Sequence, residues 1–256
     1  MKTAVVIPAR YASTRFPGKP LALIKGKPLI RRVLERVSLC KNVDAIAVAT
    51  DDKRIYDAVK KMKYGVYMTP KSCKSGTDRI AFAAKEHLRG FDIFINVQGD
   101  EPLIDPSLID SLSKELKKDD YLKYITAAYP IKKEEDLKNS NITKVIFDKK
   151  GYAIYFSRSL IPYNKSGAKI KYYKHIGIYG YKKDFLLSFA NAKMSILEKA
   201  ESLEQLRALE NGYKIKVITA KKDSIGVDVP SDIGKVSRKL KIECSTTRGQ
   251  QCRGCQ

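Results

Sequence analysis

Short apolar runs alternate with segments of helical spacing along most of the chain. Apolar runs predict strands at residues 3–9, 45–50, 66–69, 92–98, 124–131 and 214–220. Apolar residues spaced three and four apart predict helices at residues 27–40, 52–62, 77–88, 106–116 and 230–240. Alternation of strand and helix is typical of α/β proteins with right-handed crossovers. We therefore expect a Rossmann-like, mainly parallel sheet with helices on both faces.

The pattern changes in the second half of the chain. Residues 143–158, "TKVIFDKKGYAIYFSR", predict two strands around a Lys-Lys-Gly turn, and 175–182 predict another strand. Helices are expected at 184–189 and, as one continuous element, at 195–210. We therefore predict one domain over residues 1–242, with an antiparallel insertion at about 139–212. Residues 243–256 lack periodicity and are expected to form a flexible tail.

The chain of 256 residues is strongly basic, with 50 Lys and Arg against 28 Asp and Glu and a net charge of +22. Such a charge raises the alternative of a nucleic-acid-binding protein. However, the lysines occur in scattered pairs that do not interleave with aromatic residues, as a base-stacking surface requires. We expect no nucleic-acid partner.

Membrane and secretion signals are also missing from the sequence pattern. No apolar run approaches the roughly 20 residues of a membrane span, and the first residues enter a strand directly. Five cysteines, an odd number, do not resemble an oxidised secreted framework. We expect a cytoplasmic protein without a membrane partner.

A loop rich in cations follows the first predicted strand. Residues 8–20, "PARYASTRFPGKP", carry Arg10, Arg15 and Lys19 between prolines that stiffen the backbone. Ligands of open parallel sheets lie beyond the carboxyl ends of the strands, where this loop is expected. Arginine and lysine bind phosphate oxygens, so the loop is suited to a triphosphate. The alternative is a surface loop with incidental charge. The chain has neither a GxGxxG nor a GxxxxGK[ST] motif.

Two aspartates are expected near the same edge of the sheet. Asp100 follows a predicted strand in "NVQGDEP", and Asp228 precedes a proline-started helix in "GVDVP". Two carboxylates beside a phosphate-binding loop favour Mg²⁺, which prefers oxygen ligands. Taken singly, each aspartate is better explained as a helix cap or a turn residue, and it is their combination with the basic loop that favours the metal.

Several motifs together resemble a known family. "PARYASTRFPGKPL", "SGTDR", "NVQGDEP", "GYAIYFSR", "HIGIYGY", "LEQLR" and "GVDVP" occur in the order typical of the 3-deoxy-manno-octulosonate (KDO) cytidylyltransferases, over about residues 4–240. The resemblance implies a nucleotidyltransferase-like fold. It also implies a homodimer that forms CMP-KDO and pyrophosphate from CTP and KDO for lipopolysaccharide biosynthesis. CMP-sialic acid synthetases share the first loop and remain the alternative among enzymes.

The resemblance also assigns roles to residues. It implies catalytic roles for Arg10, Lys19, Asp100 and Asp228, with Mg²⁺ held by Asp100 and Asp228. It implies that CTP is bound by Pro8, Ala9, Arg10, Arg15, Lys19, Ser75, Gly76 and Arg79. It implies that the sugar is bound by Gln98, Arg158, His175, Tyr179, Glu204 and Gln205. Structural roles are an alternative for several of this last set: a surface ion pair for Arg158, a structural histidine for His175, the core for Tyr179, and a helix surface for Glu204 and Gln205.

Overall fold

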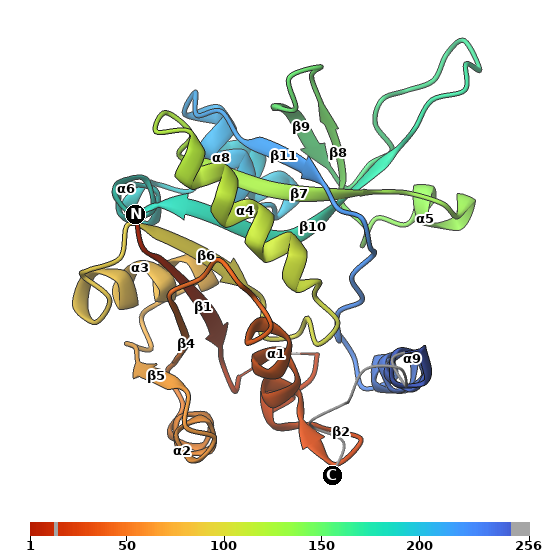
Figure 1. The fold of residues 1–256 in the computed structure, drawn as a ribbon. Coiled ribbons are helices and arrows are strands. Elements are labelled where there is room, and N and C mark those ends of the chain that lie inside the picture. The colour runs from red at the N-terminus through yellow and green to blue at the C-terminus, as the bar shows by residue number, and fades with distance from the viewer. Residues whose placement is uncertain (13–14, 247–256) are drawn as a thin grey trace.

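The computed structural model describes residues 1–12 and 15–246. Within these residues the centre is a nine-stranded mixed sheet, whose main path runs β11-β7-β10-β6-β1-β4-β5 (Figure 1). The strands of this path are β1 (Thr3–Ala9), β4 (Ala45–Thr50), β5 (Gly65–Met68), β6 (Ile93–Val97), β7 (Tyr124–Pro130), β10 (Tyr173–Lys182) and β11 (Lys216–Thr219). Pairing is parallel along β5-β4-β1-β6 and between β7 and β11. The predicted α/β fold with a mainly parallel sheet is confirmed.

Helices cover both faces of this sheet. Alternate residues of a strand point to opposite faces, so Val5 and Ile7 of β1 join one core cluster and Ala4 and Val6 join the other. The first cluster contains apolar side chains of α1 (Leu29–Val37), α2 (Lys53–Lys61) and α4 (Pro106–Lys118). The second contains those of α3 (Gly76–Glu86), α6 (Lys183–Asn191) and α8 (Gln205–Glu210).

Strand β10 is the exception to the parallel arrangement. It lies between β6 and β7 and runs antiparallel to both. The antiparallel segment predicted at about residues 139–212 thus contributes β10, which is an integral strand of the main sheet. The expected hairpin is confirmed: β8 (Lys144–Phe147) and β9 (Ala153–Ser157) pair antiparallel, and both project from the main sheet (Figure 1).

Small elements complete the fold. A turn through Lys25 and Gly26, both with positive φ, joins β2 (Leu23–Ile24) to β3 (Lys27–Pro28) in a second, two-stranded sheet. A 3₁₀ turn spans Lys19–Leu21, and short helices α5 and α7 span Glu134–Lys138 and Ile196–Glu201. Helix α9 (Asp232–Thr246) lies beside this small sheet (Figure 1).

Two sequence-based boundaries were wrong. The continuous helix expected at 195–210 is two helices, α7 and α8, because Ser202 adopts a left-handed conformation (φ 52°) that ends α7. Helix α9 continues past residue 242 as far as Thr246. The rest of the predicted tail, residues 247–256, lies outside the described residues.

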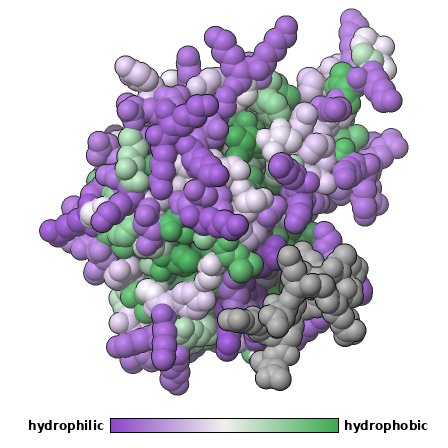
Figure 2. Space-filling model, viewed as in Figure 1, coloured by the Kyte–Doolittle hydropathy of each residue, from purple (hydrophilic) through white to green (hydrophobic). Residues whose placement is uncertain are grey.

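The surface agrees with the composition. Hydrophilic side chains cover most of the face shown in Figure 2, with apolar side chains visible in smaller areas between them. Over the described part of the chain, no helix combines the length and the apolar character that crossing a membrane requires.

Candidate active site

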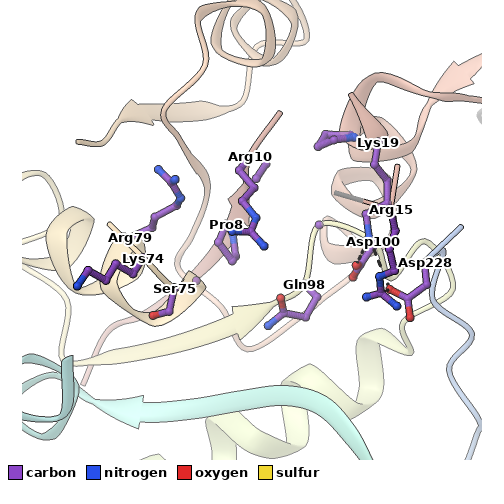
Figure 3. A pocket seen from close by; sticks show the side chains of 14 residues that line it. Pro8, Arg10, Arg15, Lys19, Lys74, Ser75, Arg79, Gln98, Asp100 and Asp228 are labelled. Atoms are coloured by element: carbon purple, nitrogen blue, oxygen red, sulfur yellow. Dashed lines mark hydrogen bonds and ion pairs between the residues drawn. The ribbon is translucent and has the colours of Figure 1, made fainter. Parts of the chain in front are cut away.

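A cleft of about 240 Å³ opens at the carboxyl-terminal edge of the sheet. Because β1, β4 and β6 are parallel, their carboxyl ends meet at this edge. The residues that line the cleft come from the end of β1 and its loop, the start of α3, the turn after β6 and the segment before α9 (Figure 3): Pro8, Ala9, Arg10, Arg15, Lys19, Pro20, Lys74, Ser75, Gly76, Arg79, Gln98, Gly99, Asp100 and Asp228. The structure therefore brings together every residue expected at the CTP and metal sites.

The cationic loop after β1 is braced by its own residues. Gly18 adopts a φ of 71°, which glycine tolerates best, and its N–H donates to the carbonyl of Tyr11 over 2.9 Å. The guanidinium of Arg54, on α2, lies 3.3 Å from the centre of the Tyr11 ring. The loop is thus attached to a neighbouring helix. Arg10 is exposed and makes no hydrogen bond or ion pair within the described residues, so it can receive an anion.

Lys19 brings the two aspartates together. Its ammonium lies 2.5 Å from Asp100 Oδ2 and 3.9 Å from Asp228 Oδ1, and it donates to the carbonyl of Val227 over 2.9 Å. Arg15 approaches Asp228 Oδ1 to 3.2 Å. Three oxygens from two segments therefore surround one cationic group. Carboxylate and carbonyl oxygens are also the ligands that Mg²⁺ prefers, so the chemistry of this donor set fits the ion.

The start of α3 forms the opposite wall. Ser75 and Asp78 make a capping box in which each side chain accepts from the other residue's backbone N–H. A Cβ added at Gly76 would lie 3.1 Å from Pro8 Cγ, so a larger residue would crowd the end of β1. The guanidinium of Arg79 donates to Thr69 Oγ1 over 2.6 Å and to Asp51 Oδ2 over 2.5 Å. This wall is closely packed against the first strand.

The proposed sugar residues are arranged differently. Only Gln98 lines the cleft, and its Nε2 donates to Asn96 Oδ1 over 3.1 Å. Arg158 donates to the carbonyls of Glu201 over 2.7 Å and Ser140 over 3.1 Å. These bonds connect the residue after β9 to the end of helix α7 and to the loop before β8, and they engage the guanidinium within the protein.

His175 lies near the start of β10. Its Nε2 is 2.9 Å from Thr126 Oγ1, and its ring packs against Phe156 and Tyr179. Burial lowers the pKa of His175 to about 3, so the imidazole is neutral at physiological pH. The Tyr179 hydroxyl donates to Gln205 Oε1 over 3.4 Å.

Glu204 connects the two groups of residues. Its carboxylate accepts from Ser75 Oγ over 3.2 Å and from Thr77 Oγ1 over 2.7 Å, both near the start of α3. Arg207 Nη2 contacts it at 2.8 Å. Burial raises the pKa of Glu204. The segment that begins α8 is therefore fastened to the wall that carries Ser75.

Sequence reasoning did not assign three of the residues that line the cleft, namely Pro20, Lys74 and Gly99. Lys74 directly precedes "SGTDR", so its place in the chain was the available signal. Gly99 lies in the turn after β6. A Cβ added there would lie 3.0 Å from the carbonyl of Pro8, which explains the need for glycine at this close approach.

A cationic loop and two carboxylates at the strand ends of this α/β sheet define a nucleotidyltransferase-type site. The family model described as "Cytidylyltransferase" matches residues 4–216. The chain belongs to the cytidylyltransferase family, and within it to the 3-deoxy-manno-octulosonate cytidylyltransferases, which confirms the resemblance stated from the motifs.

Relatives with high identity support this placement. The chain is 51% identical over 245 residues to 3-deoxy-manno-octulosonate cytidylyltransferase of Thermodesulfovibrio yellowstonii, covering 91% of this chain and 96% of that protein. It is 46% identical over 243 residues to the protein of the same name from Desulfatibacillum aliphaticivorans, covering 94% and 99%. A solved CMP:2-keto-3-deoxy-manno-octonic acid synthetase complexed with CTP superimposes with a TM-score of 0.90 at 39% identity, covering 95% of this chain and all of that one.

Proposed function

We propose that this protein transfers the cytidylyl group of CTP to KDO, giving CMP-KDO and pyrophosphate for lipopolysaccharide biosynthesis. The observation that carries the proposal is the convergence of Arg10, Arg15 and Lys19 with Asp100 and Asp228 in one cleft. Relatives named 3-deoxy-manno-octulosonate cytidylyltransferase support the choice of substrates.

The chemistry follows from the charges in the cleft. The anomeric hydroxyl of the sugar attacks the α-phosphorus of CTP and releases its proton to water. The bond between this phosphorus and the oxygen that bridges to the β-phosphorus breaks, and pyrophosphate leaves with that oxygen. Arg10, Arg15 and Lys19 hold the phosphates and stabilise the charge that moves onto pyrophosphate. Asp100 and Asp228 would hold Mg²⁺, which when bound withdraws charge from the α-phosphate.

The walls of the cleft would select the nucleotide and the sugar. We place cytosine and ribose between Pro8, Ala9, Ser75, Gly76 and Arg79, which share one side of the cleft. We place the sugar beside Gln98, toward the group Arg158, His175, Tyr179, Glu204 and Gln205. In that group Arg158 supplies the cation that a sugar acid requires.

We also propose that the protein is a cytoplasmic homodimer. Exposed apolar side chains on β9 and the following loop support a contact between two copies: Ile154 is 59% exposed and Tyr163 is 86% exposed. Light scattering tests the dimer, and a monomer at micromolar concentration would contradict it.

The deciding experiment measures pyrophosphate release with CTP, Mg²⁺ and KDO, omitting each in turn. We expect turnover only with all three present and a strong preference for CTP over ATP and GTP. Replacing KDO with sialic acid separates the two sugar candidates. Preferential turnover of sialic acid, or equal turnover of purine nucleotides, would contradict the proposal.

A further inference from the structure

Two segments far apart in the sequence carry the aspartates of the cleft. Asp100 belongs to the tight turn after β6, and Asp228 belongs to residues 220–231, which contain no helix or strand. A backbone hydrogen bond joins the two segments: the N–H of Val227 donates to the carbonyl of Asp100 over 2.9 Å. A second link between the segments is formed by side chains, since the hydroxyl of Ser224 hydrogen-bonds Oε2 of Glu101.

Glu101 lies close against the second segment. A Cβ added at Gly226 would lie 3.2 Å from Glu101 Oε1 and 3.5 Å from the carbonyl of Asp100. The carboxyl group is therefore in contact with the backbone that leads to Asp228. Glu101 is half-buried. A carboxyl group that is partly withdrawn from water is costly unless it is hydrogen-bonded, and Ser224 supplies the hydrogen bond here.

The other charged groups around Glu101 are engaged elsewhere. Lys174 of β10 pairs with Asp223 over 2.6 Å, and Lys19 is occupied by the two aspartates. Glu101 has no ion pair of its own within the described residues. Its hydrogen-bond partner in the second segment is Ser224, so the position of residues 224–228 depends on this contact.

We propose that Glu101 is a positioning residue, which with Ser224 fixes residues 224–228 against the turn 98–101 and thereby sets the separation of Asp100 from Asp228. The inference rests on the proposed role of these aspartates as the metal-binding pair. Misplacement of a reacting group by about 1 Å costs on the order of 10²-fold in rate. Loss of the contact therefore affects the metal and the chemical step more than the hold on CTP.

The test compares Glu101→Ala, Glu101→Gln and Ser224→Ala with the wild type. We expect Glu101→Ala to lower kcat about 10- to 100-fold and to raise the half-saturating Mg²⁺ concentration about tenfold, with KM for CTP changed less than about threefold. Glu101→Gln should stay within about threefold of wild type, because its amide oxygen accepts from Ser224 and its volume is similar. Ser224→Ala should shift the same parameters in the same direction, but less.

A matched control comes from the amino-terminal ends of β1 and β4, away from the cleft. There Asp44 joins two segments in a similar way, since its Oδ2 accepts from the N–H of Thr3 over 2.7 Å. Asp44→Ala should lower Tm and leave the Mg²⁺ dependence unchanged. If Glu101→Ala behaves like this control, with a lower Tm but unchanged kcat and Mg²⁺ dependence, Glu101 is merely structural and the proposal fails.

A binding measurement makes the result independent of turnover. Mn²⁺ binding is followed in the presence of a non-hydrolysable CTP analogue, for wild type, Glu101→Gln and Ser224→Ala. A Kd for Mn²⁺ raised several-fold in Ser224→Ala, and near wild type in Glu101→Gln, supports the proposal even if Glu101→Ala does not fold. An unchanged Kd in Ser224→Ala, or no Mn²⁺ binding by wild type, overturns it. Absence of turnover with KDO while Mn²⁺ binding follows the expected order would instead reject the proposed substrate.

Discussion

The nucleotide half and the sugar half of the proposed site differ in how their polar groups are engaged. In the nucleotide half, the residues lie around one cleft, and Arg10 is left without a protein partner among the described residues. In the sugar half, Arg158, His175 and Glu204 each contact other parts of the protein. The first half keeps an exposed arginine for a ligand, although Lys19 and Arg79 are paired within the protein. In the second half, Arg158, His175 and Glu204 are all hydrogen-bonded internally.

This difference has a physical consequence for binding. A group without a protein partner exchanges only water for ligand, but a group in the sugar half must give up an internal hydrogen bond or share it. Each intramolecular hydrogen bond contributes about 0.5–1.5 kcal/mol net to stability. Binding in the sugar half is therefore favourable only if the ligand replaces the hydrogen bonds that are lost. Substitutions should therefore differ between exposed residues of the nucleotide half, such as Arg10 and Asp228, and residues of the sugar half. The former should change activity alone, and the latter should change activity and stability together.

The largest effect is expected from the carboxylates. Asp100→Asn and Asp228→Asn remove the negative charges proposed to hold the metal, and each should lower kcat on the order of 10²- to 10³-fold. Asp228 has a side chain 58% exposed, so Asp228→Asn should leave Tm nearly unchanged. Pyrophosphate release and thermal unfolding measure the two quantities. Asp57→Asn, which alters an exposed ion pair on α2, is the control, and near-wild-type turnover of both cleft variants would defeat the metal assignment.

An intermediate effect is expected from Arg158. Arg158→Gln should raise KM for KDO about tenfold, since a charged hydrogen bond is worth about 1.5–3 kcal/mol, while KM for CTP stays the same. It should also lower Tm, because the carbonyls of Ser140 and Glu201 lose their donor. Arg89→Gln removes a comparable guanidinium-to-carbonyl bond at the end of α3 and serves as control. A lower Tm with an unchanged KM for KDO would show that Arg158 is structural only.

The smallest effect concerns His175 and pH. The pKa of about 3 in the folded state lies below the ordinary value of 6.5, so between these values the unfolded chain binds a proton that the folded protein excludes. The free energy of unfolding should fall as pH falls through this window, by at most about 1.4 kcal/mol per pH unit from this group. His175→Gln should reduce this pH dependence by up to one proton, as measured by urea unfolding at pH 7, 6 and 5. Parallel curves for the two proteins would contradict the assignment.

Much of the fold was predictable because its determinants are local. The apolar runs of β1, β4 and β6 and the helical spacing of α1 to α4 follow from side-chain periodicity alone. The same holds for the placement of Arg10 and Asp100 just after β1 and β6, and of Lys19 in the loop that follows β1. These residues meet because parallel strands present their carboxyl ends at one edge.

The remaining features depend on contacts between distant residues. The position of β10 between β6 and β7 depends on which strands pair, and the periodicity of side chains along one strand carries no information about its neighbours. The contact of Glu101 with Ser224 and that of Glu204 with Thr77 likewise join separate segments. The break at Ser202 is local, but a serine with positive φ has no strong sequence signal. By contrast, the glycine of the Lys25-Gly26 turn is a local sequence signal for a turn.

The place of β10 in the sheet has a consequence for how the chain is made. When synthesis reaches residue 172, β5, β4, β1 and β6 have their mutual partners, but β6 has an open edge and β7 lacks both β10 and β11. Open edges readily pair with other chains. Arrival of β10 closes β6 and β7 together. Fragments that stop before Tyr173 should therefore aggregate during expression, although they contain most of the cleft-lining residues.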